Sequence, residues 1–161
     1  MNFIVGNLLR YLSEEESFWV FTAINENMLP IDYYADMMGI LIDQKVFENL
    51  LCQHYPKIVA HMKKCNYMLD LIAFQWLVTL FFNSLNHEAE KFVLTAFLLK
   101  GQKIIIKIAL LIIELFKDEV MEADAFDQIY MIMSHNPMTE VTPQILRKML
   151  QDTKKLKLTA K

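Results

Sequence analysis

The sequence predicts an all-α protein, an orthogonal array of about eight to ten helices in a single domain. Its 161 residues include only three glycines and four prolines, too few for the many tight turns of a β-sandwich or barrel. Hydrophobic residues make up 55% of the chain and charged residues 22%, which excludes a disordered polymer. Apolar residues recur at helical spacing, and no segment alternates as a strand would.

The first two predicted helices are defined by signals at their ends. Residues 1–12 form an apolar helical segment. Ser13 and Glu16 have the spacing of a capping box, so a second helix is expected to begin there and to extend to about residue 28. Leu29-Pro30 ends it, because the residue before a proline avoids the helical region.

The next segment, residues 31–38, is expected to be irregular or a short helix that Gly39 closes. Ile40–His54 is predicted to be an amphipathic helix, and Pro56 to begin another that reaches Lys64. The side chains expected to face the core from the first of these two helices are Ile42, Val46, Leu50 and Leu51.

Two nearly apolar segments, 69–84 and 102–117, are predicted to be central helices, with only a polar strip of each exposed. A helix is expected between them from Asn86 to Lys100, where Gly101 stops it. The polar strips are Gln75, Thr79 and Asn83 in the first segment, and Lys103, Lys107 and Glu114 in the second. No transmembrane span is expected, because polar residues interrupt both apolar stretches before the roughly 20 residues that a span needs.

The C-terminal part is predicted to contain a helix over 121–133 and a loop over 134–141 that includes Asn136-Pro137. Thr142-Pro143 is an N-cap followed by a proline at the first helical position, which begins a last helix. Residues 142–161 hold six basic side chains and one acidic, while the whole chain has a formal charge of −3. The basic segment is a candidate for peripheral contact with an anionic membrane or an acidic partner. We favour a solvated final helix with cations near its C-terminal dipole.

The acidic balance argues against nucleic acid as the main partner. Four ligands of the zinc type, Cys52, His54, His61 and Cys65, lie within 14 residues, but they lack the paired spacing of a structural site, and ordinary buried cysteines are the favoured interpretation. The chain has no glycine-rich phosphate loop, nucleophile elbow or metalloprotease helix, so no catalytic residue, cofactor or metal is predicted. Two cysteines and no secretory signal indicate a reduced, cytoplasmic protein.

Six segments of the chain stand in a recognisable order: MNFIVGNLL, EEESFWVF, DYYADMMGILIDQKVFENLL, Pro56 with His61, FQWLVTLFFNSLNHE and FLLKGQKIIIKIALLII. Together they resemble the TBC domain, the Rab GTPase-activating family. The resemblance implies that residues 1–137 are the C-terminal part of a TBC domain, and that 138–161 are a loop plus a basic trailing helix. It also implies an all-helical fold and a Rab-type small GTPase as partner. The activity implied is stimulation of GTP hydrolysis in vesicle trafficking, in the cytoplasm or at endomembranes.

The family's two catalytic side chains are an arginine in an Ile-x-x-Asp-x-x-Arg motif and a glutamine in a Tyr-x-Gln motif, followed by Gly-Met-Asn. Met1-Asn2 matches the last two residues of that run, so both motifs are expected upstream of residue 1. Arg10 and Arg147 are the only arginines, and neither occupies the finger motif. Because an arginine finger is worth about 10³–10⁵ in rate, this chain alone is expected to be an inactive piece of a GTPase activator and not itself an enzyme.

Four residues are candidates for binding the partner: Asn2, Asp43, Gln44 and Gln75. By the resemblance, Asn2 lies just after the family's catalytic glutamine, where it would steady the loop that carries this glutamine or contact the Rab. The alternative is that Asn2 is an ordinary N-terminal cap of a helix. Asp43-Gln44 matches an Asp-Gln pair of the family, with a polar helix face as the alternative. Gln75 begins an exposed strip.

Three aromatic residues, Phe18, Trp19 and Trp76, are assigned to the core. The chain departs from the family pattern at two places. Leu94-Thr95 stands where the family has Trp-Asp, and Lys100 stands where the family has an acidic residue before the glycine. These departures predict that the last part of the domain packs differently.

Two further classes of function stay open. One is a non-catalytic Rab-binding or scaffolding helical protein. The other is a small helical protein of the membrane surface, suggested by a mean hydropathy of +0.25 and the basic end.

Overall fold

The computed structural model describes residues 2–31, 33–67 and 69–152. Within these ranges the chain forms ten α-helices, one π-helical turn and no strand, so the predicted all-α class is confirmed. In chain order they are α1 (Asn2–Leu8), α2 (Glu14–Ala23), the π-helical turn η1 (Ile24–Met28), α3 (Met38–His54), α4 (Pro56–Lys64), α5 (Leu69–Thr79), α6 (His87–Lys100), α7 (Lys103–Leu115), α8 (Lys117–Glu122), α9 (Phe126–Glu140) and α10 (Pro143–Asp152).

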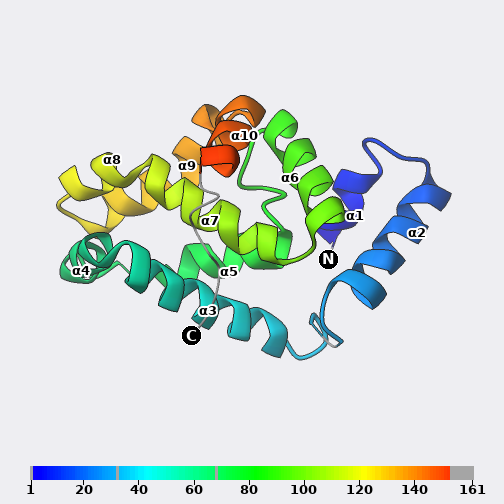
Figure 1. Ribbon diagram of the computed structural model, residues 1–161, viewed down its shortest axis with the longest axis horizontal. Helices are drawn as coiled ribbons and strands as arrows, with labels where there is room; N and C mark the ends of the chain where they lie inside the picture. The colour runs from blue at the N-terminus through cyan, green and yellow to red at the C-terminus, as the bar shows by residue number, and fades with distance from the viewer. Residues whose placement is uncertain (1, 32, 68, 153–161) are drawn as a thin grey trace.

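Helix α7 is the centre of the array, packing against α3, α5, α6, α8 and α10 (Figure 1). Helices α4 and α8 pack together at one end of the molecule, and α1 and α2 at the other. In the part of the chain that the structure describes, no helix has both the length and the apolar character needed to cross a bilayer.

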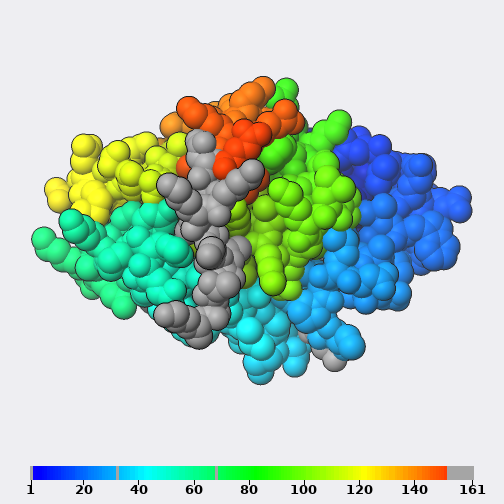
Figure 2. All heavy atoms as spheres, viewed as in Figure 1, coloured from blue at the N-terminus to red at the C-terminus, as the bar shows by residue number. Residues whose placement is uncertain are grey.

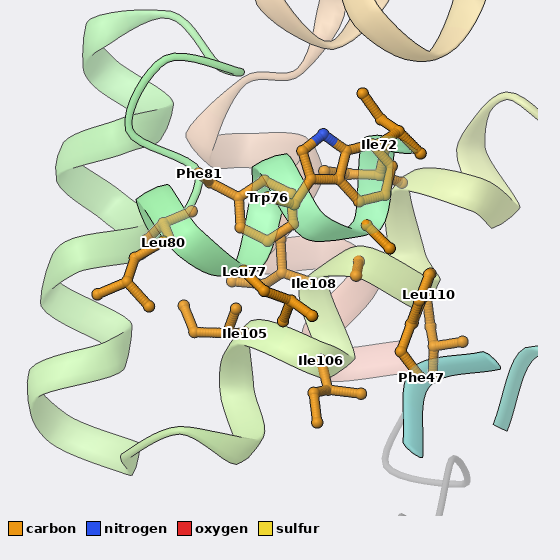
Figure 3. Close-up of a cluster of buried hydrophobic side chains, with 14 of the residues drawn as sticks. Phe47, Ile72, Trp76, Leu77, Leu80, Phe81, Ile105, Ile106, Ile108 and Leu110 are labelled. Atoms are coloured by element: carbon orange, nitrogen blue, oxygen red, sulfur yellow. The ribbon is translucent and has the colours of Figure 1, made fainter. Parts of the chain in front are cut away.

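The core includes α7 and aromatic side chains of α3, of α5 and of the segment after α5. Nine of the 13 residues of α7 are buried, which confirms the prediction of a central helix. Trp76 stacks on Phe81 with ring centroids 5.3 Å apart (Figure 3). The Phe47 ring contacts Trp76 edge to face, with centroids 6.5 Å apart. Each fully buried side chain of this size contributes about 1.5–3 kcal/mol relative to exposure.

Three of the helix-end signals predicted from the sequence are confirmed, at Ser13, Thr142 and Gly101. The Ser13 hydroxyl accepts from the Glu16 amide at 3.4 Å, and the Glu16 carboxylate accepts from the Ser13 amide at 2.9 Å. The Thr142 hydroxyl likewise accepts from the Ile145 amide at 3.3 Å and caps α10. Gly101 has φ 74° after α6, a conformation that glycine tolerates best.

The start and the buried face of α3 differ from the prediction. The helix begins at Met38, so Gly39 lies in its first turn and does not close the preceding segment. Ile42 is 57% exposed, so its predicted inward orientation is wrong. The buried row begins instead at Ile40 and continues through Phe47, because this row faces α5 and α7.

Helix α5 ends at Thr79, earlier than predicted, and Leu80, Phe81 and Asn83 have positive φ. Thr79 is only 5% exposed, so the predicted exposed strip is wrong at this position. Its hydroxyl donates to the Gln75 carbonyl at 2.8 Å, which satisfies the buried polar group within the helix. Leaving the helix lets the chain bury both Leu80 and Phe81.

The predicted helix 121–133 is two helices, α8 and α9, with residues 123–125 between them. The predicted loop 134–141 is wrong, because α9 continues through Pro137 to Glu140. Pro137 is buried, and the neighbouring Asn136 amide donates to the Glu119 carboxylate at 2.6 Å. A proline cannot donate a backbone hydrogen bond within the helix. The burial of Pro137 and this contact with α8 help to compensate for the stability that is lost with that bond.

Candidate partner-binding surface

Asp43 lies where three segments of the chain meet. Its Oδ2 atom accepts a hydrogen bond from the Tyr33 hydroxyl at 2.8 Å and a short one from the Gln102 amide. Tyr33 is in the turn before α3, and Gln102 is at the corner between α6 and α7. Burial raises the pKa of Asp43 above its usual value, and the two hydrogen bonds oppose that shift. Burial and the adjacent carboxylate raise the pKa of Tyr33, so its hydroxyl stays a donor.

Gly39 allows Tyr33 to reach Asp43. A Cβ atom at position 39 would lie 2.4 Å from Cδ2 of the Tyr33 ring. Met37, just before the helix, has φ 60°, which turns the chain sharply into α3. The turn, the glycine and the carboxylate therefore form one local arrangement at the start of α3.

The four predicted partner-binding residues lie on three different helices, α1, α3 and α5. Asp43 and Gln44 are neighbours on α3, but Gln44 is 7% exposed and its amide donates to the Asp70 carbonyl at 3.2 Å. Gln44 therefore joins α3 to the first turn of α5 and leaves little surface for a partner. Asn2 is exposed at the start of α1, and Gln75 is exposed on α5. Their contact with a partner stays a prediction.

Sequence reasoning missed an apolar surface at the start of α3. Its side chains are exposed although they are large and hydrophobic: Ile31, Met37, Met38, Leu41 and Ile42. A large group of exposed apolar side chains is a candidate interaction surface in a soluble domain. The sequence signal that could have found it is the run of apolar residues on both faces of the first turn of α3.

Phe18 and Trp19 are 60% and 61% exposed, so their assignment to the core is wrong. Their rings contact each other edge to face, with centroids 5.3 Å apart. Helix α2 packs on α1 and η1 and lies at one end of the molecule (Figure 1). Trp76, in contrast, is fully buried as predicted.

Arg10 has a structural role. Its guanidinium lies 3.6 Å from the Glu90 carboxylate and makes a short contact with His87, whose Nδ1 is 3.3 Å from the same carboxylate. The Glu90 side chain is 5% exposed, and its other carboxylate oxygen accepts a hydrogen bond from the backbone amide of Asn83 at 3.0 Å. This cluster ties the segment after α1 to the first turn of α6.

Arg147 is exposed on α10 and lines a groove of about 620 Å³ between α10 and α6. Two positions at which the chain departs from the family pattern, Thr95 and Lys100, line the same groove, whereas Leu94 is buried.

The predicted zinc-type ligands make protein contacts. His61 Nε2 lies 2.8 Å from the Ala123 carbonyl oxygen, and Cys65 Sγ lies 3.6 Å from the same atom, which links α4 to the end of α8. Cys52 is exposed, so its assignment as a buried cysteine is wrong. Among the described residues, no three His, Cys, Asp or Glu side chains are grouped so that they could hold a metal ion.

These features define an all-helical domain with a candidate partner-binding surface: a carboxylate fixed by a tyrosine and an amide near the start of α3, where apolar side chains are exposed. Residues 1–121 match the model of the Rab-GTPase-TBC domain family, described as RabGAP-TBC. The chain belongs to this family, which confirms the resemblance read from the sequence.

Curated proteins similar to the chain support the same family. TBC1 domain family member 2A of Homo sapiens is 33% identical over 132 residues, which are 81% of this chain and 14% of that protein. TBC1 domain family member 2B of Mus musculus is 30% identical over 123 residues, 76% of this chain and 13% of that protein. A putative GTPase-activating protein of Emericella nidulans is 31% identical over 122 residues, covering 76% of this chain and 11% of that protein.

The fold is also that of a solved relative. The crystal structure of the Chlamydomonas flagellar RabGAP TBC domain superposes with a TM-score of 0.82 at 23% sequence identity. The match covers 94% of this chain and 51% of the solved chain. This chain therefore has the fold of about half of that domain.

Proposed function

We propose that this chain acts in a Rab GTPase-activating protein, as the C-terminal part of its TBC domain. The observation that supports this proposal most directly is the family match over residues 1–121. The activity is stimulation of GTP hydrolysis by a Rab-type GTPase, in the cytoplasm at trafficking membranes. Because the chain spans only 11% to 14% of the curated relatives, the activity and partner of a whole protein are part of the proposal.

We further propose that this chain supplies binding surface and framework, and that it is catalytically inactive alone. Phosphoryl transfer in this setting needs an arginine delivered to the γ-phosphate. Arg10 is engaged with Glu90, and Arg147 lies on the last described helix, in a groove beside α6. Losing an arginine finger costs about 4–7 kcal/mol of transition-state stabilisation, which binding contacts made equally before and during the reaction do not restore.

The proposed partner contacts are Asn2, Asp43 and Gln75, together with the apolar side chains at the start of α3. Gln44 would act as a positioning residue through its bond to Asp70. We propose the TBC domain over residues 1–137 and a basic trailing segment over 138–161. Since α9 is continuous across Pro137, the first break in helix after this boundary is at residues 141–142.

Single-turnover GTP hydrolysis with a panel of Rabs tests the proposal. Two proteins are compared: this chain, and a chimera in which it replaces the matching 132 residues of TBC1 domain family member 2A. We expect the chimera to accelerate hydrolysis by at least 100-fold with one or more Rabs, given about 10³–10⁵ for a complete arginine finger. We expect the chain alone to give no acceleration.

The possible results separate the functions. A chain that accelerates hydrolysis by itself would contradict the proposed inactivity. A folded but inactive chimera, with a chain that still binds GTP-loaded Rab, would favour the non-catalytic scaffold. A folded chimera without activity and a chain without binding would reject both functions.

We also propose that the basic end, residues 142–161, contributes peripheral contact with anionic membranes. Leu146 of α10 is buried, so removing all of this segment would disturb the core. Vesicle flotation of the intact chain against a chain lacking residues 153–161 is the better test. Equal flotation of both would reject a contribution from the removed residues.

A further inference from the structure

The groove between α6 and α10 is a second surface, independent of the Rab function proposed above. It follows one face of α6 from Glu88 to Lys100, and α10 forms its other wall. Figure 2 shows α10, in orange, beside the green of α6 on the same face of the molecule. The groove has a volume of about 620 Å³, which is within the size range of ligand sites.

The walls of the groove are held in place by contacts beneath it. Asn86, the N-cap of α6, donates from its side-chain amide to the Val141 carbonyl at 2.7 Å, just before α10 begins. Leu146 of α10 is buried in the core. The groove therefore exists before any ligand binds, which lowers the entropic cost of binding.

The floor of the groove is apolar and incompletely covered. Phe92, Ala96 and Leu150 line it, and Leu99, at 78% exposure, extends the apolar surface toward the end of α6. Phe92, Ala96 and Leu99 are four and three residues apart on α6, so they form one stripe along that helix. A ligand that fits this stripe needs an apolar edge of matching length.

The charges of the groove are spread along it. Lys91 and Lys100 on α6 and Arg147 on α10 are its three cationic side chains, and Glu88 is its one acidic side chain. The two lysines are nine positions apart, so their Cα atoms are about 13.5 Å apart along the helix at 1.5 Å per residue. Lys91 also lies over the Tyr11 ring at 5.3 Å, which holds it at the edge of the groove.

We propose that this groove binds an acidic amphipathic helix of a partner protein. An apolar stripe bounded by spaced charges is the surface that a helix with one apolar face and flanking acidic residues complements. A single anionic lipid headgroup would need its cations gathered at one point, whereas these are distributed over more than two helical turns. Residues 153–161 of the chain itself are excluded by like charge, since they hold four lysines and no acidic residue.

The position of Glu88 favours one of the two orientations in which a partner helix can lie in the groove. It stands at the N-terminal end of the groove, and Lys100 stands at the opposite end. A bound helix with a basic residue beside Glu88 and acidic residues elsewhere would match every charge of the groove. The opposite orientation would place like charges together, which lowers affinity.

A synthetic peptide tests the proposal directly. The probe is a capped 15-residue helical peptide with leucines on one face, glutamates flanking them and one lysine near an end; it would be about 22 Å long. A control peptide has lysine in place of every glutamate. With fluorescence anisotropy at low salt, we expect the full chain to bind the acidic peptide at least tenfold more tightly than the control peptide, and this advantage to shrink as salt is raised.

Two matched pairs of variants locate the binding. Arg147→Glu should weaken binding of the acidic peptide about tenfold, whereas Lys148→Glu, the same charge change outside the groove on the same helix, should change it less than twofold. Leu99→Ala should weaken binding severalfold, and its exposed neighbour Leu98→Ala should not. All four positions have exposed side chains, so circular dichroism and thermal unfolding are expected to show folded proteins.

Three results would overturn the proposal. The first is equal affinity for the acidic and control peptides, or equal effects of Arg147→Glu and Lys148→Glu. The second is absence of peptide binding together with binding to phosphatidylserine vesicles that Arg147→Glu abolishes, which would assign the groove to a membrane. The third is a dimer in sedimentation that Arg147→Glu dissociates, which would assign it to a second copy of the chain.

Discussion

At the scale of single residues, Asp43 is a carboxylate that the fold keeps partly out of water. Because its pKa is raised in the folded state, the folded state binds the proton more tightly than the unfolded state does. The stabilisation from this group is therefore complete below the usual pKa of 3.8 and is lost as pH rises through the raised value. This sign is opposite to that of an ordinary paired carboxylate.

The substitution Asp43→Asn should remove the loss of stability that ionisation of Asp43 causes as pH rises. The amide oxygen can still accept from Tyr33 and Gln102, but it carries no charge to desolvate. We expect the melting temperature of Asp43→Asn to rise relative to the original chain between pH 4 and pH 7, measured by circular dichroism. A difference in melting temperature that does not change with pH would contradict the assignment.

Asp43→Ala should be less stable at every pH, by about 1–3 kcal/mol, because two donors lose their acceptor.

The sequence pointed to Asp43 but not to its partners. The Asp-Gln pair marked the position, whereas Gln102 is 59 residues away and meets Asp43 only in the folded chain. Gln44 shows the same limit, since its bond to Asp70 spans 26 residues. Sequence patterns indicate which residues are neighbours on one helix. They do not indicate these two contacts, because each joins different helices or segments of the chain.

At the scale of elements, the start of α3 depends on a glycine. We expect Gly39→Ala to destabilise the chain by about 1–3 kcal/mol, the usual range for overpacking a filled site. The new methyl group would lie 2.4 Å from the Tyr33 ring and displace it from Asp43. Chemical denaturation measures the free energy of unfolding.

Gly6→Ala is the matched control, because Gly6 lies within α1 and a Cβ atom there meets nothing within 4 Å. This substitution should stabilise the chain by about 0.5–1 kcal/mol, since alanine favours the helix and restricts the unfolded state. If both alanines have the same effect, the close packing of Tyr33 on Gly39 is not what constrains the turn.

The elements also show where sequence reasoning succeeds. Ser13 and Thr142 are caps whose partners lie three residues away, so the local sequence is enough to predict them. Thr79 and Pro137 were mispredicted because packing of distant helices decides whether the chain leaves or continues a helix there. The order of helices was predictable, and several of their ends were not.

At the scale of the whole molecule, large hydrophobic side chains are exposed on several helices, and α2 carries an exposed pair of aromatic rings. The rings of Phe18 and Trp19 form one exposed pair, and α2 packs on α1 and on the π-helical turn that follows it. Their assignment to the core failed because aromatic residues are usually buried, and the sequence does not show which helices cover α2. Covering each ring in a contact between copies would contribute up to about 1.5–3 kcal/mol toward association.

We therefore expect the chain to self-associate at micromolar concentration, as measured by sedimentation velocity. Phe18→Lys combined with Trp19→Lys should shift it toward monomer, because both positions are exposed and the added charges oppose contact between copies. The control is Met131→Lys with Met138→Lys, which adds the same charge at two exposed apolar positions of α9 that are seven residues apart. A monodisperse monomer from the unaltered chain, or equal effects of the two double variants, would show that the aromatic patch on α2 does not drive association.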